Sequence, residues 1–306
     1  MNWPKIHLKG TFYLLLAIAC WGTVPLFLRS FIHEIDAWTA NGFRYPFSAL
    51  FWGIPFFFFW RRGKVEPRVY GLVIVPTLIN LFSQSLWALA PYYLTPGLQM
   101  FFGQASVLFG IAASFLLFQD ELQLIYSKAF WAGICLCILG FIGMNVLKGN
   151  FQGQLTGIGL AIILAQSFFM GLYGVSVRYY LRGIPPWISF AVICFYTSVG
   201  LVTLMLFLGE PSRLGTLSAG RWVVLCISSV IGIALAHVFF YHAIMHVGVS
   251  ISNGVKLLMP FLTAIGSYFL FQEVFSLGQW LSGVLILLGA GMLLYSQHVF
   301  FQERIP

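Results

Sequence analysis

The chain has 306 residues, a net charge of +8 and a mean hydropathy of +0.91, and 60% of its residues are apolar while 8% are charged. A soluble domain carries about a quarter charged residues, so these charges are too few to cover the chain with a water-facing surface. The composition therefore predicts an integral membrane protein. The basic residues form no stripe or arm, which argues against a nucleic-acid partner. The five cysteines lie in apolar runs without metal or disulfide spacing, so no metal or other cofactor is expected.

Ten apolar runs follow one another along the chain. A spanning helix needs about 20 mostly apolar residues, because the hydrocarbon core of a bilayer is about 30 Å thick. The runs cover residues 10–29, 37–60, 69–92, 97–118, 127–147, 155–178, 187–208, 221–243, 251–271 and 278–297. Strands of a membrane barrel would be about half as long and would alternate polar with apolar residues. We therefore predict an all-α polytopic membrane protein with ten transmembrane helices.

The basic residues predict the orientation, because cytoplasmic loops carry an excess of Lys and Arg. With a cytoplasmic N-terminus, the inner loops hold Lys5, Lys9, Arg61, Arg62, Lys64, Arg68, Lys128, Arg178, Arg182 and Arg304. The outer loops then hold only Arg29, Lys148, Arg213 and Arg221. We expect a multi-pass protein of the inner (cytoplasmic) membrane of the cell, with both termini cytoplasmic.

The second half of the chain repeats the first. Span 4 ends with FLLFQDE at Glu121 and span 9 ends with YFLFQE at Glu273, an offset of 152 residues, while Pro25 and Gly174 correspond at an offset of 149. Because each unit holds five spans, an odd number, the second copy is inverted in the membrane, as in secondary transporters. The predicted units are residues 1–148 and 153–298, followed by a cytoplasmic tail at 299–306.

Several short motifs occur in a fixed order along residues 10–297. They are Trp21-Gly22, Phe43-Arg44, Phe239–Gly248, Met259-Pro260, Gln272-Glu273 and the glycines of spans 5 and 10. In these features the chain resembles the EamA family of the drug/metabolite transporter superfamily. The two halves differ at two of these positions: the second-half counterpart of Trp21 is Met170, and the first-half counterpart of Pro260 is Leu108. The resemblance implies a transporter of amino acids or other small metabolites, without naming the substrate.

Acidic residues are absent from the middle of the predicted spans, since all eight lie at span ends or in loops. Two cations, Arg44 in span 2 and Lys256 in span 9, therefore have no intramembrane acid to pair with. A guanidinium can hold a carboxylate through two parallel hydrogen bonds, so the pair predicts an anion site. Two alternatives stay open: Arg44 could bond backbone carbonyls, and Lys256 could extend to the cytoplasmic surface.

Other polar and aromatic side chains share helix faces with small or polar residues. Gln104 is the repeat counterpart of Lys256, and His237 is the best candidate for a proton site, although a histidine bonded to a helix carbonyl is the alternative. The full set of predicted substrate-binding residues is Arg44, Lys256, Gln84, Gln104, His237, Trp21, Asn80, Trp87, Tyr241 and Gln166.

Proline removes a helix hydrogen bond and glycine loosens packing, so Pro25, Gly174 and Pro260 are predicted hinge points. The glycines of spans 5 and 10 predict close helix contacts, and these two spans are expected to form either scaffold or the surface of a homodimer.

Together these features predict a secondary transporter, expected to be an exporter, of a small organic metabolite such as an amino acid or a related carboxylate-bearing solute, by alternating access. The expected partners are this small-molecule substrate and the lipid bilayer. No HExxH, GxSxG or paired metal-ligand motif is present, so we do not expect an enzyme. The alternative is a flippase of the same fold for a lipid, an amphiphile or a drug, since an aromatic-rich cavity open to the bilayer has a similar sequence.

Overall fold

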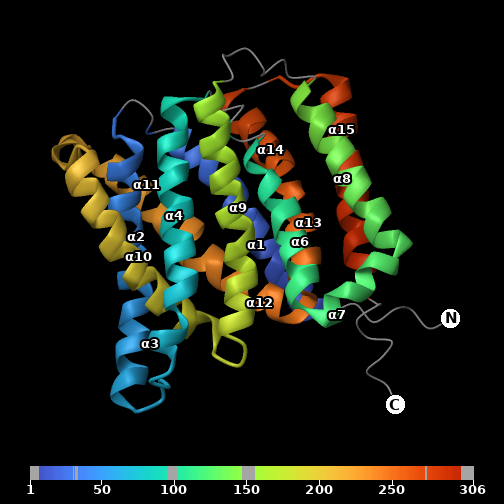
Figure 1. The fold of residues 1–306 in the computed structure, drawn as a ribbon. Helices are drawn as coiled ribbons and strands as arrows, with labels where there is room; N and C mark the ends of the chain where they lie inside the picture. Colours follow the sequence, from blue (N-terminus) through green and yellow to red (C-terminus); the bar gives the residue numbers. More distant parts are fainter. Residues whose placement is uncertain are drawn as a thin grey trace.

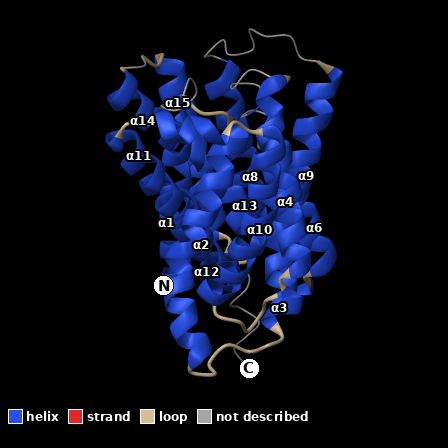
Figure 2. Ribbon diagram, turned by 90° about the vertical axis from the view of Figure 1, so that its left-hand side faces the viewer, coloured by secondary structure: helices blue, strands red, loops and turns tan. Residues whose placement is uncertain are grey.

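The computed structural model describes residues 7–29, 31, 34–94, 99, 102–146, 156–272 and 274–297, and within them every regular element is helical (Figure 2). The elements of the first half are α1 (Leu8–Arg29), α2 (Ala37–Arg61), α3 (Val69–Leu72), α4 (Ile74–Leu89), η1 (Ala90–Tyr92), α6 (Ala105–Leu117), α7 (Gln119–Leu122), η2 (Gln123–Tyr126) and α8 (Lys128–Val146). Those of the second half are α9 (Gly157–Tyr180), α10 (Pro186–Leu208), η3 (Pro211–Thr216), α11 (Ala219–Ser229), η4 (Val230–Leu235), α12 (Ala236–Val247), α13 (Val249–Val255), η5 (Lys256–Leu258), α14 (Met259–Phe271) and α15 (Leu277–Tyr295). The prediction of an all-helical membrane protein is confirmed for this part of the chain.

By length and apolar composition, seven helices in the described residues could cross a membrane, or eight if a bent pair counts as one span. The bent pair is α6 with the segment Gln119–Tyr126, which turn by 114° relative to each other. Helix α2 is not among the seven although it has 25 residues, and Arg44 and two prolines interrupt its apolar sequence. The count of ten spans therefore stays a prediction.

Two of the spans are irregular. The span Ala219–Val247 contains a π-helical segment, η4, and the span Val249–Leu270 contains a 3₁₀ turn, η5. A π segment widens the helix and leaves carbonyl groups for other donors, and such segments are frequent at functional sites. Both irregular segments lie at the centre of the bundle, next to Arg44 and Lys256.

The packing of the helices follows the sequence repeat (Figure 1). Helix α1 packs on α12 and α14, and its counterpart α9 packs on α4 and α6. The remaining large contacts, α2 with α10 and α8 with α15, each join a helix to its own counterpart. The two halves therefore interlock instead of forming separate bodies.

The corresponding helices α1 and α9 run in opposite directions. Lys9, at the start of α1, and Arg178, at the end of α9, line the same cavity. The start of α9 lies instead beside the end of the η1 segment, where Thr156 is hydrogen-bonded to the carbonyl oxygen of Tyr93. We call the end of the bundle where α1 begins the Lys9 end; the short helix α7 marks it in Figure 1.

Helices α8 and α15 lie side by side at the right-hand edge of Figure 1. Their glycines allow this contact, because a Cβ atom added to Gly133 or Gly289 would come within 3.0 Å of the facing backbone. Gly140 faces the carbonyl oxygen of Ser282 in the same way. The glycine seam that the sequence predicted is therefore used within the chain, and the homodimer stays a prediction.

Candidate functional site

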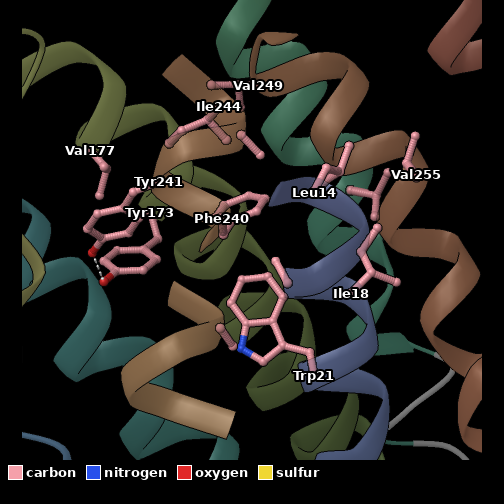
Figure 3. Packing of buried hydrophobic residues seen from close by; sticks show 14 of the residues in the cluster. Leu14, Ile18, Trp21, Tyr173, Val177, Phe240, Tyr241, Ile244, Val249 and Val255 are labelled. Carbon is pink, nitrogen blue, oxygen red and sulfur yellow. Dashed lines mark hydrogen bonds between the residues drawn. The ribbon is translucent and has the colours of Figure 1, made fainter. Parts of the chain in front are cut away.

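Aromatic side chains from α1, α9, α10 and α12 meet at the centre of the bundle. In Figure 3 the indole of Trp21 extends from α1 toward Phe240 of α12, and the two ring centroids are 5.0 Å apart. Trp21 also contacts the ring of His237 edge-on at 5.2 Å. Tyr173 and Tyr241 are almost fully buried and are hydrogen-bonded to each other through their hydroxyl groups (Figure 3). Two of the residues predicted from the sequence, Trp21 and Tyr241, thus belong to one cluster.

Lys256 points into this cluster and does not extend to the membrane surface. Its side chain is 5% exposed, and its ammonium group lies 5.3 Å from the ring centroid of Phe240 and 6.0 Å from that of Trp21. Its hydrogen-bond acceptor is the Asn253 side-chain oxygen at 3.0 Å. Among the described residues, no acidic group pairs with Lys256. The buried ammonium group of Lys256 therefore lies near two aromatic rings and donates to one neutral acceptor.

Arg44 is also buried, with 3% of its surface exposed, but its surroundings differ. Its Nη2 atom donates to the carbonyl oxygen of Ser228 at 3.2 Å, just before the π segment η4. The Nε atom of Arg44 has no hydrogen-bond partner within the described part of the chain. This geometry agrees with the alternative in which Arg44 bonds a backbone carbonyl.

Ser48 and Trp52 extend the same face of α2, because residues four apart lie above one another on a helix. The Ser48 hydroxyl lies 2.8 Å from the carbonyl oxygen of Ser229, and the Trp52 indole donates to that of Ala234 at 2.8 Å. From the sequence, Ser48 is expected on the same helix face as Arg44, one turn later, whereas Trp52 is not among the predicted residues although it follows at the same spacing. The stripe binds the carbonyl groups around η4 and fixes α2 against the span that carries His237.

His237 lies near both cations. Its Nδ1 atom is 2.9 Å from the carbonyl oxygen of Ile233, one turn earlier in the same span, and its ring stacks on Phe190 at 4.9 Å. Its Nε2 atom is buried and has no partner in the part of the chain that the structure describes. The charges of both Lys256 and Arg44 act at its ring. The imidazole therefore presents one free nitrogen inside the cluster.

The polar residues of α4 are bonded to the neighbouring helices α9 and α10. Asn80 is buried and donates to Thr197 of α10 at 3.2 Å, while its Oδ1 atom has no partner among the described residues. Gln166 of α9 donates to Ser83 of α4 at 3.2 Å. These two predicted residues therefore join α4 to α9 and α10 in the described structure.

Within the described residues, no hydrogen bond or ring contact joins Gln84, Trp87 or Gln104 to the aromatic cluster. Gln84 and Gln104 are half-buried. The Trp87 ring packs near Gly103 and the residues around it, and its backbone carbonyl accepts a hydrogen bond from Gln99 at 3.0 Å. The structure therefore does not bring these three residues together with Lys256.

The three predicted hinge positions differ from one another. Helices α1 and α9 continue without interruption past Pro25 and Gly174. Gly174 allows a close approach, because a Cβ atom added there would lie 3.2 Å from the ring of Phe240. Pro260 follows the 3₁₀ turn η5, so only this position coincides with an irregular helix. Motion at any of the three stays a prediction.

A buried ion pair lies at the Lys9 end. Glu121 is fully buried and binds Arg178 of α9, and its carboxylate accepts the backbone N–H groups of Val249 and Ser250 at 2.6 and 2.7 Å. Asp120 binds the same guanidinium at 2.6 Å. The sequence placed Glu121 at a span end and gave no sign that it is buried. This pair joins α7 of the first half to α9 and α13 of the second.

Two adjoining cavities lie near this end. The first, which we call the aromatic chamber, has a volume of about 380 Å³ and is lined mainly by Tyr13, Trp52, Phe59, Trp187, Phe239 and His242. The second, the basic vestibule, has a volume of about 570 Å³ and is lined by Lys9, Asp120, Arg178, Arg182, His242 and His246, among others. His242 is common to both cavities.

Comparison with known proteins places the chain among transporters. The pattern of the EamA-like transporter family matches residues 8–146 and again residues 157–295. An uncharacterized transporter of Haemophilus influenzae is 22% identical over 233 residues, which cover 73% of this chain and 75% of that protein. An uncharacterized transporter of Methanothermobacter thermautotrophicus is 24% identical over 253 residues, covering 77% of this chain and 69% of that protein.

A solved crystal structure has a similar fold. Its TM-score with this chain is 0.77 at 14% sequence identity, and the match covers 92% of this chain and 96% of that one. At this identity the likeness supports the fold alone.

Proposed function

Because the chain belongs to the EamA-like transporter family, we propose that it is a secondary transporter that exports a small organic anion, such as a carboxylate-bearing metabolite, by alternating access. The observation that carries this proposal is Lys256, a buried cation without an acidic partner in the described residues. The substrate's negative group would supply the missing charge.

The energetics of a buried charge support this role. Removing an ammonium group from water costs several kcal/mol, even after the protein relaxes. A cation–π contact returns about 2 kcal/mol when it is desolvated, and a hydrogen bond to a charged group about 1.5–3 kcal/mol. Lys256 has two such rings, those of Trp21 and Phe240, and donates to the side-chain oxygen of Asn253. A carboxylate beside it would add a charge-assisted hydrogen bond and lower the cost of burial.

Alternating access would use the antiparallel packing of the two halves. The excess of basic residues predicts that the Lys9 end faces the cytoplasm. The ion pair between Glu121 and Arg178 then lies on the cytoplasmic side, where it joins the halves. If α9 moved relative to α6 and α7, this ion pair would have to break, or Glu121 would have to move together with Arg178.

A thermal-shift experiment tests the role of Lys256. The purified protein is heated in detergent with a panel of amino acids and short, non-aromatic organic acids, because a bound ligand raises apparent stability by mass action. We expect at least one anion to stabilise the wild type and a Lys64→Gln control, but not Lys256→Gln. An equal shift in Lys256→Gln would contradict the proposal.

The flippase of an amphiphile is the second candidate, and the aromatic chamber favours it. Saturable, trans-stimulated uptake of a water-soluble anion into proteoliposomes would support the carrier. Transport only of molecules dissolved in the bilayer would support the flippase.

A further inference from the structure

We propose that the aromatic chamber and the basic vestibule form one two-part entry site for an amphiphilic organic anion. The apolar body of the ligand occupies the chamber, its acidic group occupies the vestibule, and His242 stands between them. This inference rests on the proposed function, since the same kind of ligand would continue to Lys256.

The vestibule has the charge that an acidic group requires. Arg178 is bound by Asp120 and Glu121, which leaves Lys9 and Arg182 without an acidic partner in the described part of the chain. The charge of Lys9 acts at the ring of His242. Two exposed cations therefore face a cavity whose only acidic lining residue, Asp120, is already paired.

The chamber has the opposite character. Its lining is mostly aromatic, and Trp52 and Trp187 lie nearly parallel with ring centroids 6.1 Å apart. Phe59 closes on Trp187 edge-on at 4.9 Å. Ligand pockets of about 300–1,000 Å³ are typical for small molecules, and aromatic walls favour a flat or apolar body. A simple inorganic anion or a short acid would gain nothing from these walls.

His242 makes the two cavities one site. Its ring stacks on Tyr13, with centroids 4.5 Å apart and an angle of 17° between the planes. The side chain is half-buried and lines both cavities. A ligand that fills both would therefore pass along one face of this imidazole, with its acidic group on the side of Lys9.

The entry site adjoins the central cluster through α12. Successive residues of a helix point about 100° apart, so neighbours serve different faces. Phe239 lines the chamber, while Phe240 lies over Lys256. The proposed entry site and the proposed central site therefore lie on different faces of the same turn of α12.

Binding of naphthaleneacetate to the protein in phosphatidylcholine nanodiscs tests the inference. Acetate, which lacks the body, and naphthalenemethanol, which lacks the charge, serve as comparison ligands. We expect naphthaleneacetate to bind at least tenfold more tightly than either. Equal binding of naphthalenemethanol would overturn the basic part of the site, and equal binding of acetate would overturn the aromatic part.

Variants locate the binding. The double variant Lys9→Ala, Arg182→Ala should weaken naphthaleneacetate binding about fivefold, because exposed charges contribute modestly. The control Arg213→Ala removes an exposed arginine that lines neither cavity and should bind as the wild type does. Trp187→Leu should remove most of the preference for naphthaleneacetate over acetate.

Two further outcomes separate this inference from its alternatives. Naphthaleneacetate binding should persist in Lys256→Gln. If binding were lost in Lys256→Gln but kept in the double variant, the probe would bind at the central site. That result would overturn the entry site but leave the proposed function standing. Displacement of the probe when phosphatidylglycerol replaces phosphatidylcholine would assign the vestibule to a lipid headgroup and overturn the inference. Persistent binding in phosphatidylglycerol discs supports it.

Discussion

The two buried cations of the bundle have different surroundings, although the sequence presents them as a pair. Arg44 lies against the π segment η4, where its guanidinium bonds the carbonyl oxygen of Ser228 and continues a stripe of donors on α2. Lys256 lies under the rings of Trp21 and Phe240 and donates to the side-chain oxygen of Asn253. The first arrangement joins two helices, whereas the second leaves a charge available to a ligand.

A third cation, Arg178, is half-buried and is paired with two carboxylates. It binds Asp120 and Glu121, and it also packs over the ring of Phe118 at 4.4 Å. The charge of Arg44 is compensated less than that of Arg178 and more than that of Lys256. The three cations therefore rank by how much of their charge is already compensated, from Arg178 through Arg44 to Lys256.

The largest effect on stability is expected at the paired cation. Glu121→Ala leaves Arg178 and the N–H groups of Val249 and Ser250 without their acceptor, and breaking a buried ion pair costs about 3–5 kcal/mol. We expect a lower melting temperature in detergent. The control Glu66→Ala breaks an exposed pair with Arg68 and should cost less than about 1 kcal/mol. Similar losses in both variants would contradict the ranking.

The largest effect on transport is expected at the uncompensated cation. Lys256→Gln removes the charge but keeps a long polar side chain. The substrate would then lose a hydrogen bond to a charged group, which is worth about 1.5–3 kcal/mol. This loss corresponds to a fall of about 10- to 100-fold in the transport rate at low substrate concentration. Initial rates in proteoliposomes measure it. The melting temperature should stay the same or rise, since a buried unpaired charge is removed. A lower melting temperature with normal transport would mean that Lys256, like Arg178, acts in holding helices together and not in binding the substrate.

Arg44→Ala should have a smaller effect that falls first on stability. The substitution leaves the carbonyl oxygen of Ser228 unsatisfied and opens space beside Gly232, at a cost of about 1–3 kcal/mol. Ser48→Ala removes the neighbouring donor and should lower the melting temperature less. If Arg44→Ala abolished transport at an unchanged melting temperature, Arg44 would belong with Lys256 as a ligand-binding residue.

The sequence was sufficient for the class of fold, because few charges, long apolar runs and a five-span repeat all constrain it directly. It also singled out Lys256 and Trp21, since a cation and a large ring stand out in apolar spans. It could not separate Arg44 from Lys256, because that difference depends on carbonyl groups that a π segment frees in another helix. Burial of Glu121 depends likewise on the 114° turn after α6, which brings residues 121 and 249 together. Such contacts arise from tertiary packing and leave no local pattern.

The smallest effect is expected at the N-terminus of α2, the helix that carries Arg44. Asp36 precedes this helix and its side chain accepts from the N–H of Thr39 at 2.9 Å. Partial burial alone would raise the pKa of Asp36, but hydrogen bonds from Thr39 and from the N–H of Glu210 outweigh it and hold the pKa below its ordinary value. The ionised cap therefore contributes stability above about pH 4, and this contribution, about 1 kcal/mol, is lost as the pH falls through the lowered pKa.

Melting temperatures measured in detergent between neutral pH and about pH 3 test this effect against Asp36→Asn, which keeps a capping side chain that does not titrate. We expect the difference in stability between wild type and variant to shrink on acidification. Anion binding at Lys256 should not follow the same titration, because Asp36 bonds Thr39 and Glu210 and none of the residues around Lys256. A shared titration of stability and binding would mean that the two cations form one coupled site, and the distinction between them would fail.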